Sequence, residues 1–516
     1  MALRTKLLLL SLALTVAGGA GAYFGPSEGI VHTLSLGIGT IGLLWTLLMF
    51  APVQVFTIFT IPELRRKIFI TLAFLAIYRI GYYVPLPMID QVKLAEQMEQ
   101  ASGGALGRVL GFVSLFSGGN LSQSCIFALG IMPYISASII MQLLSSGVIP
   151  SLERLRKEGE SGRKKINEYT RYLTVPICLI QATMYVQSIM RAATADGGGY
   201  GAAINGVLAT DFNALYFGIT AVLIMTTGCI FLMWIGEQID EYGIGNGISL
   251  IIMAGIVARL PEAIGSLIFV PGTTTIKPSI FTLGSDTGDI SLEKMVVLAF
   301  LFVAVVLGVI LITKAQRRIP TQSAKHVRGR RTFGGTRQFL PMKLNAAGVM
   351  PVIFAGTLLI LPGFVFNIIS SYNPSAVWAA EIGAIFQRGS GWIYNISYVI
   401  LIYIFCYFWV AITFNPKEVA DNLKDHGSFI PGYRPGKSTA DYLERVLMRI
   451  TFVGAAFLAI IAVIPTIMTT ELQVDQNVAQ YFGGTGLLIV VSVALDLVQK
   501  INSHLVMRNY PGLTED

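Results

Sequence analysis

The sequence has little charge for its length, and this shortage decides its class. Only 13% of its 516 residues are Asp, Glu, Lys or Arg, whereas 54% are hydrophobic, and the mean hydropathy is +0.67. A soluble globule of this size needs more polar surface than that, so most of the surface must face lipid. We therefore expect an integral membrane protein.

Cysteine and histidine are also scarce, which argues against metal and nucleophilic chemistry. The four cysteines lie inside apolar stretches without a CxxC spacing, and none of the four histidines has a second type of ligand beside it. Cysteines in such positions are typical small packing residues. We predict no metal site, no cofactor and no enzymatic activity.

Nucleotide-binding patterns are lacking as well. Residues 243–247 read GIGNG, but they follow a predicted helix and have no βαβ context. Residues 158–165 are basic and contain two glycines, but the spacing GxxxxGK[ST] is absent and a solvated loop is the better interpretation. Any energy-driven process must therefore draw its energy from a partner.

What the sequence does contain is a series of apolar stretches of roughly 20 residues, separated by charged loops. About 20 apolar residues allow an α-helix to cross a hydrocarbon core about 30 Å thick, whereas a membrane β-barrel would show short alternating strands. The stretches predict an all-α polytopic protein with ten membrane-spanning helices. These lie near residues 68–83, 123–146, 172–190, 213–235, 248–268, 295–313, 345–367, 393–413, 446–468 and 482–501.

The loops between these helices differ sharply in positive charge. Residues 146–171 carry seven Lys or Arg, residues 314–344 carry nine and residues 414–449 carry six. Positive loops stay on the cytoplasmic side of a membrane, so we expect these loops and the C-terminus in the cytoplasm. The net charge of +8 is then mainly a sign of topology.

Two further apolar segments, residues 7–24 and 31–56, precede the ten. A basic start followed by a leucine-rich core and small residues near position 20 is typical of a cleavable signal peptide. Retention of both segments as one or two additional helices brings the chain back to the same side of the membrane, and we favour retention. We assign residues 1–58 to an N-terminal extension.

A short motif occurs twice in the chain. Residues 130–135 read GIMPYI, and residues 348–353 read GVMPVI. Five predicted helices separate the copies, and because five is odd the second copy enters the membrane from the opposite side, as in an inverted-topology repeat. We expect two five-helix halves, residues 59–268 and 295–516, joined by an external loop at 269–294.

Pro133 and Pro351, one in each copy, are expected to kink their helices and to face the protein interior, because lipid does not satisfy the carbonyl that a proline frees. Branched apolar side chains flank them at Ile131, Ile135 and Ile353. A constriction of such side chains excludes water and offers an ion nothing to coordinate. With helix centres nearly free of charge, this favours a pore for a bulky and chemically varied passenger.

Two segments outside the helices are candidates for moving or docking parts. Residues 112–122 read FVSLFSGGNLS; they form either a simple loop cap or a segment that hinges at its two glycines. The loop at 314–344 is more basic than orientation requires, so it is either a docking surface for acidic protein or RNA phosphates or a plain topology signal. The candidate docking residues, including one in a Pro- and Gly-rich loop at 415–443, are Arg317, Arg318, Arg328, Arg330, Arg331 and Arg434.

Longer blocks of the sequence resemble the SecY family, the channel-forming subunits of the bacterial Sec protein translocase. The similarity runs in order from about residue 62 to 501. Its blocks are residues 116–119, 126–144, 157–165, 236–238, 243–249, 345–354, 414–424, 434–436 and 482–485.

The resemblance implies an hourglass channel that opens across the membrane for secreted chains and sideways for transmembrane segments. Its lateral gate would lie between helices 123–146 and 172–190 on one side and 345–367 and 393–413 on the other, with Asn246 a polar contact near the pore or gate. The pore ring would be Ile131, Ile135, Ile248, Ile252, Ile353 and Ile489. A plug at about residues 113–124 would involve Phe112, Val113, Leu115, Phe116, Ser117, Gly118 and Gly119.

The resemblance also implies partners and a location. SecE and SecG would be the small membrane subunits, the SecA motor ATPase or the ribosome would dock on the basic loops, and preproteins with signal sequences would be the passengers. The location would be a bacterial inner membrane, with lipid around the helices. Family members run straight into the first helix, so residues 1 to about 58 depart from the pattern.

Two other function classes fit parts of the sequence. An inverted-repeat secondary transporter of a small solute is favoured by the repeat, but the lack of charged residues at the helix centres and the large basic loops argue against it. An intramembrane protease would need a buried Ser/His or paired Asp arrangement, and the predicted helices show neither.

Overall fold

The structure, a computed structural model, describes most of residues 61–506. The candidate plug, the N-terminal extension, residues 269–291 of the external loop and Arg330 lie outside the described residues. The described ranges are 61–87, 125–145, 149–192, 214–268, 292–323, 326–328, 331–333, 337–356, 358–359, 362, 366, 377–385, 392–471, 474, 478–479, 481 and 484–506.

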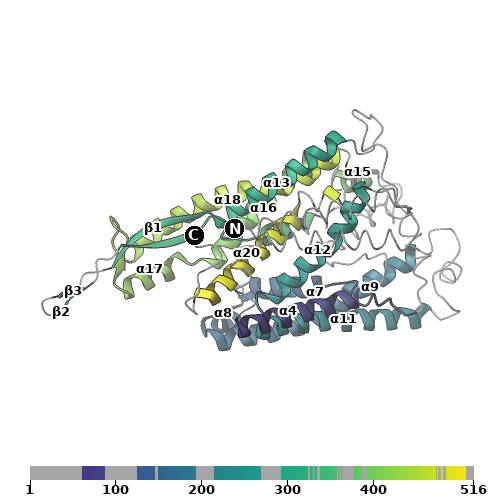
Figure 1. The fold of residues 1–516 in the computed structure, drawn as a ribbon, viewed down its shortest axis with the longest axis horizontal. Helices are drawn as coiled ribbons and strands as arrows, with labels where there is room; N and C mark the ends of the chain where they lie inside the picture. The colour runs from purple at the N-terminus through teal and green to yellow at the C-terminus, as the bar shows by residue number, and fades with distance from the viewer. Residues whose placement is uncertain are drawn as a thin grey trace, which may run out of the picture. The chain divides into compact units, whose positions relative to one another are not determined.

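The described chain is predominantly helical, which confirms the predicted fold class (Figure 1). Six of its helices are long and apolar enough to cross a membrane: α11, α12, α13, α16, α18 and α20. The helices are α4 (Pro62–Gly81), α7 (Met132–Leu143), α8 (Pro150–Lys157), α9 (Glu160–Ala192), α11 (Ala214–Tyr242), α12 (Gly247–Ile268), α13 (Leu292–Lys314), α15 (Val377–Ile385), α16 (Trp392–Thr413), α17 (Pro416–Asp425), α18 (Lys437–Glu471) and α20 (Thr485–Val506).

Three helices differ clearly from their predicted bounds. The helix expected at 123–146 begins only at Met132, because residues 126–131 form turns. α9 and α18 begin 12 and 9 residues before the apolar stretches that predicted them. Their first turns are polar, so a search for apolar windows cannot see where these helices leave the membrane.

The chain divides into two compact units. In the smaller one, the described residues are 61–72, 242–244 and 498–506, and the backbone N–H of Ile244 donates a hydrogen bond to Thr71 Oγ1 at 3.1 Å. The larger unit comprises residues 73–241 and 245–497, and it contains all six candidate pore-ring residues.

Two large buried clusters form the core of the larger unit. The first draws on α4, α7, α9, α11 and α12, and the second draws on α13, α16, α18 and α20. Lipid is as apolar as these side chains, so close van der Waals packing holds such helices together. One example lies where α11 crosses α12: a Cβ atom on Gly247 would collide with the carbonyl oxygen of Gly236.

Two small antiparallel sheets, one of three strands and one of two, form where the sequence predicted no strand. β1 (Gln316–Ser323) pairs with β4 (Arg337–Lys343) on one edge and with β5 (Ser428–Phe429) on the other, and β2 (His326–Arg328) pairs with β3 (Arg331–Phe333). Ile319 of β1 is 1% exposed and belongs to a cluster with Leu443 of α18. These strands were not recognised in the sequence because they contain two prolines and several arginines. Proline has no N–H to donate to a sheet, and the charged residues interrupt the alternation of apolar and polar side chains by which a strand is recognised.

Candidate functional site

The two copies of the repeated motif have the same local backbone. Gly130 and Gly348 both lie in the left-handed region, with φ of 57° and 67°. Each is followed by one turn residue and then by a helix that begins at Met132 or Met350. A side chain strains that φ, so both copies require glycine at this position.

The kinks predicted at Pro133 and Pro351 are wrong. Pro133 lies in the first turn of α7, and Pro351 is the second residue of the helical segment 350–356. A proline there removes an N–H that has no partner within the helix, and its fixed φ suits the helix start. Each proline therefore begins a helix.

The candidate pore-ring residues come from four helical segments. Ile131 and Ile135 lie at the start of α7, and Ile353 lies in the segment 350–356. α12 contributes Ile248 and Ile252, and α20 contributes Ile489. Ile131, Ile135, Ile353 and Ile489 are each at most 8% exposed, and the two residues of α12 are half-buried.

The structure brings these six residues into one continuous apolar region. Ile131 and Ile135 belong to the first large cluster, against which Ile248 packs. Ile353 and Ile489 belong to a smaller cluster. The two clusters share the half-buried side chains that pack against both of them, namely Met132, Ile252 and Val493.

The prediction that helix centres are nearly free of charge overlooks two residues, Arg259 and Glu262, which lie three positions apart inside the apolar span of α12. Arg259 is only 9% exposed. Two charged residues in a long apolar stretch leave its mean hydropathy high, so the span was recognised and the charges were overlooked.

Asn246 caps α12 in the structure. Its Oδ1 accepts a hydrogen bond from the backbone N–H of Ser249 at 3.1 Å, while Asp240 Oδ1 accepts one from Gly247 at 2.8 Å. These bonds satisfy N–H groups that have no partner within the helix. The side chain of Asn246 is otherwise exposed, and its contact with a gate stays a prediction.

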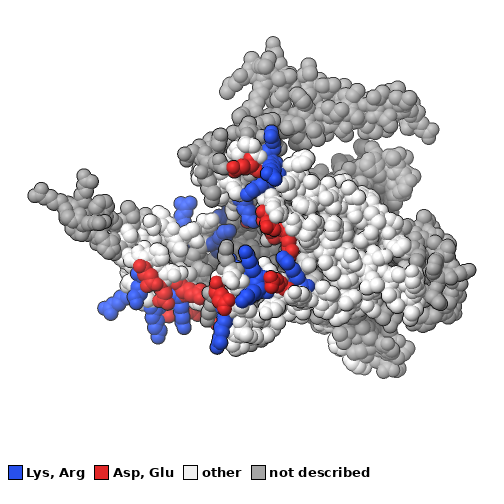
Figure 2. All heavy atoms as spheres, turned by 90° about the horizontal axis from the view of Figure 1, so that it is seen from below, with Lys and Arg blue, Asp and Glu red and all other residues white. Residues whose placement is uncertain are grey.

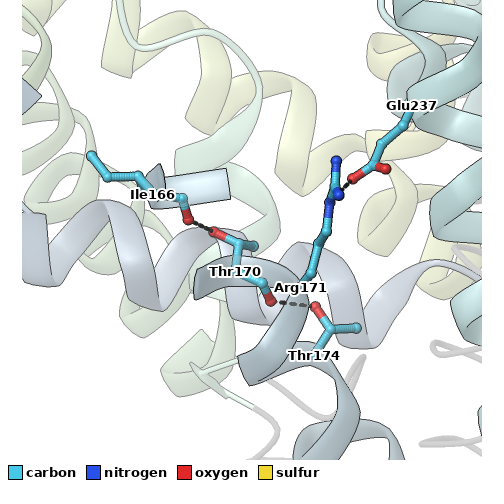
Figure 3. A network of polar contacts seen from close by, with 5 residues as sticks. All are labelled: Ile166, Thr170, Arg171, Thr174 and Glu237. Atoms are coloured by element: carbon cyan, nitrogen blue, oxygen red, sulfur yellow. Dashed lines mark hydrogen bonds and ion pairs between the residues drawn. The ribbon is translucent and has the colours of Figure 1, made fainter. Parts of the chain in front are cut away.

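A polar network links α9 to α11 and was missed by the sequence analysis (Figure 3). Arg171 Nε of α9 donates to Glu237 Oε1 of α11 at 2.6 Å. Beside it, the hydroxyls of Thr170 and Thr174 donate to the carbonyls four residues earlier, at 2.9 and 2.7 Å, which satisfies them inside the helix. Glu237 lies in one of the family-like blocks, but its partner is 66 positions away and no local pattern reveals it.

The two small sheets carry part of the candidate docking residues. Arg317 and Arg318 are exposed on β1, and Arg328 of β2 is paired in register with Arg331 of β3. On the face shown in Figure 2, charged side chains gather toward one end, and most of the remaining described surface is uncharged.

Arg434 is exposed in a turn between β5 and α18. Gly432 and Gly436 on either side of it have φ of 88° and 100°, which glycine adopts without strain. The hydroxyl of Thr439 donates to the carbonyl of Arg434 at 2.8 Å. The Pro- and Gly-rich composition predicted such a turn.

Within the described part of the chain, no group of three or more His, Cys, Asp or Glu side chains lies together in a way that could hold a metal ion. The four cysteines are free thiols, and all of them are buried.

Comparison with known proteins decides the family. The model of the SecY family matches residues 125–498. The protein translocase subunit SecY of Streptomyces galbus is 42% identical over 454 residues, which cover 88% of this chain and 98% of that protein. The chain belongs to the SecY family. The protein translocase subunit SecY of Corynebacterium glutamicum is 43% identical over 456 residues, which cover 87% of this chain and 97% of that protein.

Solved structures show the same fold. A protein-conducting channel superposes with a TM-score of 0.53 at 20% identity, covering 88% of this chain and 95% of that one. Sec61 in a canine ribosome-channel complex from the endoplasmic reticulum superposes with a TM-score of 0.50 at 19% identity, with the same coverage. The six isoleucines therefore lie together within a fold that this chain shares with these solved structures.

Proposed function

We propose that this chain is the pore subunit of a Sec translocon, a gated channel that passes unfolded secretory proteins across a membrane and releases transmembrane segments sideways into lipid. One observation carries the proposal: a SecY-family chain gathers six isoleucines from four helical segments in one continuous apolar region. Branched apolar side chains around a narrow pore block ions and water at rest and yield to a passing chain.

The channel is passive and is not an enzyme. Its sequence has no nucleotide-binding pattern, so a partner or the growth of the nascent chain supplies the energy. A signal sequence enters the lateral gate between the helices predicted at 123–146 and 172–190 and those at 345–367 and 393–413. There it makes apolar contacts that only the open state offers, and these shift the population toward that state.

The two small sheets, which carry exposed arginines, and the turn at Arg434 form the docking surface for the partner that supplies the energy. SecA and the ribosome are the proposed occupants, and the ribosome-bound Sec61 complex supports the second. Exposed arginines suit both, because they pair with carboxylates of a protein and with phosphates of RNA. SecE and SecG complete the complex in the membrane.

The proposed location is a bacterial inner membrane, with the basic loops and the C-terminus in the cytoplasm. Residues 59–268 and 295–516 are the two inverted halves, and the plug at about residues 113–124 seals the closed pore together with the isoleucine ring. The matched left-handed glycines and helix starts of the two motif copies support the repeat.

Reconstitution tests the function. The chain is assembled with SecE and SecG in vesicles and supplied with SecA, ATP and a preprotein with a signal sequence. The proposal expects protease-protected preprotein inside the vesicles, dependent on ATP and on an intact signal sequence. Saturable uptake of a small solute, with no protected preprotein, would instead support the transporter.

A further inference from the structure

The two copies of the repeated motif are preceded by the same pair of backbone contacts. The residue four positions before the left-handed glycine is Ile126 in the first copy and Leu344 in the second. In both cases the backbone N–H contacts the end of the first helix of that half, and the backbone carbonyl contacts the fourth helix. The recurrence points to a role that both copies need.

The backbone N–H groups bind the ends of α4 and α13, the first helices of the two halves. The N–H of Ile126 donates a hydrogen bond of 3.1 Å to the carbonyl of Val84, shortly after α4 ends. The N–H of Leu344 donates one of 2.9 Å to the carbonyl of Ala315, directly after α13 ends. One main-chain hydrogen bond therefore fixes the approach to each motif copy to the preceding helix.

The backbone carbonyls of the same two residues lie against buried glycines of α11 and α18, the fourth helices of the two halves. A Cβ atom on Gly228 of α11 would collide with the carbonyl oxygen of Ile126. A Cβ atom on Gly454 of α18 would lie 2.7 Å from the carbonyl oxygen of Leu344, which is also too close. Glycine allows backbones to approach this closely, so a side chain at either position must displace the peptide it faces.

The first of these peptides leads directly into the candidate pore ring. Residues 125–128 form one turn and residues 127–130 form the next, and main-chain hydrogen bonds of 3.0 and 2.8 Å close them. Ile131 follows at once and is 1% exposed. Because protein interiors are close-packed and transmit strain, a displacement of the Ile126 peptide would move Ile131.

Ile353 holds the corresponding position in the second copy. It follows Leu344 by nine positions, as Ile135 follows Ile126. Ile353 and Ile135 are 8% and 7% exposed, and both lie in the first turns of helices that begin after the left-handed glycine. The second peptide is therefore placed to position a ring residue in the same way as the first.

We propose that Gly228 and Gly454 are positioning residues of the pore: each seats the peptide before one motif copy and so holds the ring residues of its own half in the closed seal. This inference rests on the proposed function. It makes the seal depend on α11 and α18, neither of which contributes a candidate ring residue. Since each half has its own glycine, the loss of one should displace the ring residues of that half alone.

The test measures the two halves of the ring separately. Ile131→Cys or Ile353→Cys is placed in a chain without the four native cysteines, the complex is assembled with SecE and SecG in vesicles, and the rate of reaction with a water-soluble maleimide is measured. Gly228→Ala should raise the rate at position 131 about tenfold, the change in population that about 1.4 kcal/mol of overpacking strain produces, and should leave position 353 unchanged. Gly454→Ala should do the reverse.

A second readout and two controls separate positioning from a general loss of stability. With the ring isoleucines intact, each glycine variant should make resting vesicles leak ions. Gly218→Ala in α11 controls for the substitution itself, because nothing lies within 4 Å of its Cβ. Leu443→Ala controls for lost stability, because it removes a fully buried side chain of α18 from a cluster that contains no ring residue. Both controls should keep the labelling rates of the reference chain.

A rise confined to the half that carries the glycine variant supports the inference. Equal rises at both positions, no rise, or the same rise in Leu443→Ala would overturn it. If Gly228→Ala does not assemble, Gly454→Ala carries the whole comparison. Labelling needs no passenger, so failure of the unmodified complex to translocate a preprotein, or labelling confined to one half without any ion leakage, would count against the proposed function instead.

Discussion

At the scale of single residues, backbone conformation and side-chain shape are the properties that the two motif copies share. Gly130 and Gly348 adopt the same left-handed conformation before helices that start in the same way. The sequence showed that these positions correspond, but it led to the wrong role for the prolines. The sequence G-x-M-P alone does not indicate whether a helix passes through the motif or begins within it. The structure shows that a helix begins at the methionine of each copy.

The glycine requirement is testable at Gly348. A Cβ atom there would meet nothing within 4 Å, so Gly348→Ala tests backbone strain alone. We expect a loss of about 1 kcal/mol in stability, because an L-residue in the left-handed region costs about that much. Thermal unfolding in detergent measures it. Gly218→Ala, in α11 and equally free of steric conflict, should be neutral or slightly stabilising; equal losses in both variants would show that strain is not the cause.

The seal of the pore is testable at Ile353. Ile353→Asn places an amide in the apolar region, which favours a wetted and open pore. We expect ion leakage through vesicles that contain the complex and acceptance of preproteins with defective signal sequences. Ile353→Leu keeps an apolar side chain of the same size and should remain tight. Equal tightness of the Asn and Leu variants would contradict the assignment of Ile353 to the ring.

At the scale of elements, close helix crossings decide where the helices lie. Gly247→Ala should destabilise the protein by about 2 kcal/mol or more, because its Cβ would collide with the carbonyl of Gly236 in α11. Gly265→Ala on the same helix has nothing within 4 Å and is the matched control. Thermal unfolding compares the two variants, and a tolerated Gly247→Ala would mean that α11 and α12 do not cross as described.

The ion pair between α9 and α11 should contribute little to stability. Arg171 and Glu237 are 48% and 23% exposed, and exposed pairs are worth about 1 kcal/mol or less. A double-mutant cycle with Arg171→Ala and Glu237→Ala should give a coupling energy in that range at low salt, and added salt should weaken it. A coupling that is several-fold larger and insensitive to salt would show that the pair is buried when the complex is assembled.

The elements also show which part of the fold the sequence can predict. Apolar stretches reveal a membrane helix because lipid imposes both its length and its composition. They do not reveal the polar first turns of α9 and α18 or the sheet of β1, β4 and β5, because water imposes no such pattern. β1 is held by tertiary packing of Ile319 against α18, which no local sequence signal reports.

At the scale of the whole molecule, the account depends on one claim, that a translocating chain passes between the helices that carry the six isoleucines. The repeated motif alone identified Ile131, Ile135 and Ile353 as candidates, and the family resemblance supplied the other three.

The most direct measurement is disulfide crosslinking to a chain in transit. Single cysteines replace Ile131 and Ile353 in a background without the four native cysteines, and a secretory chain with its own cysteine is stalled in the channel. A cysteine in place of Leu307, which is 56% exposed on α13, is the control. The account predicts strong crosslinks at both isoleucine positions, dependent on SecA and ATP, and none at position 307. No crosslink at either isoleucine position, in an assembled complex with an engaged chain, would contradict it.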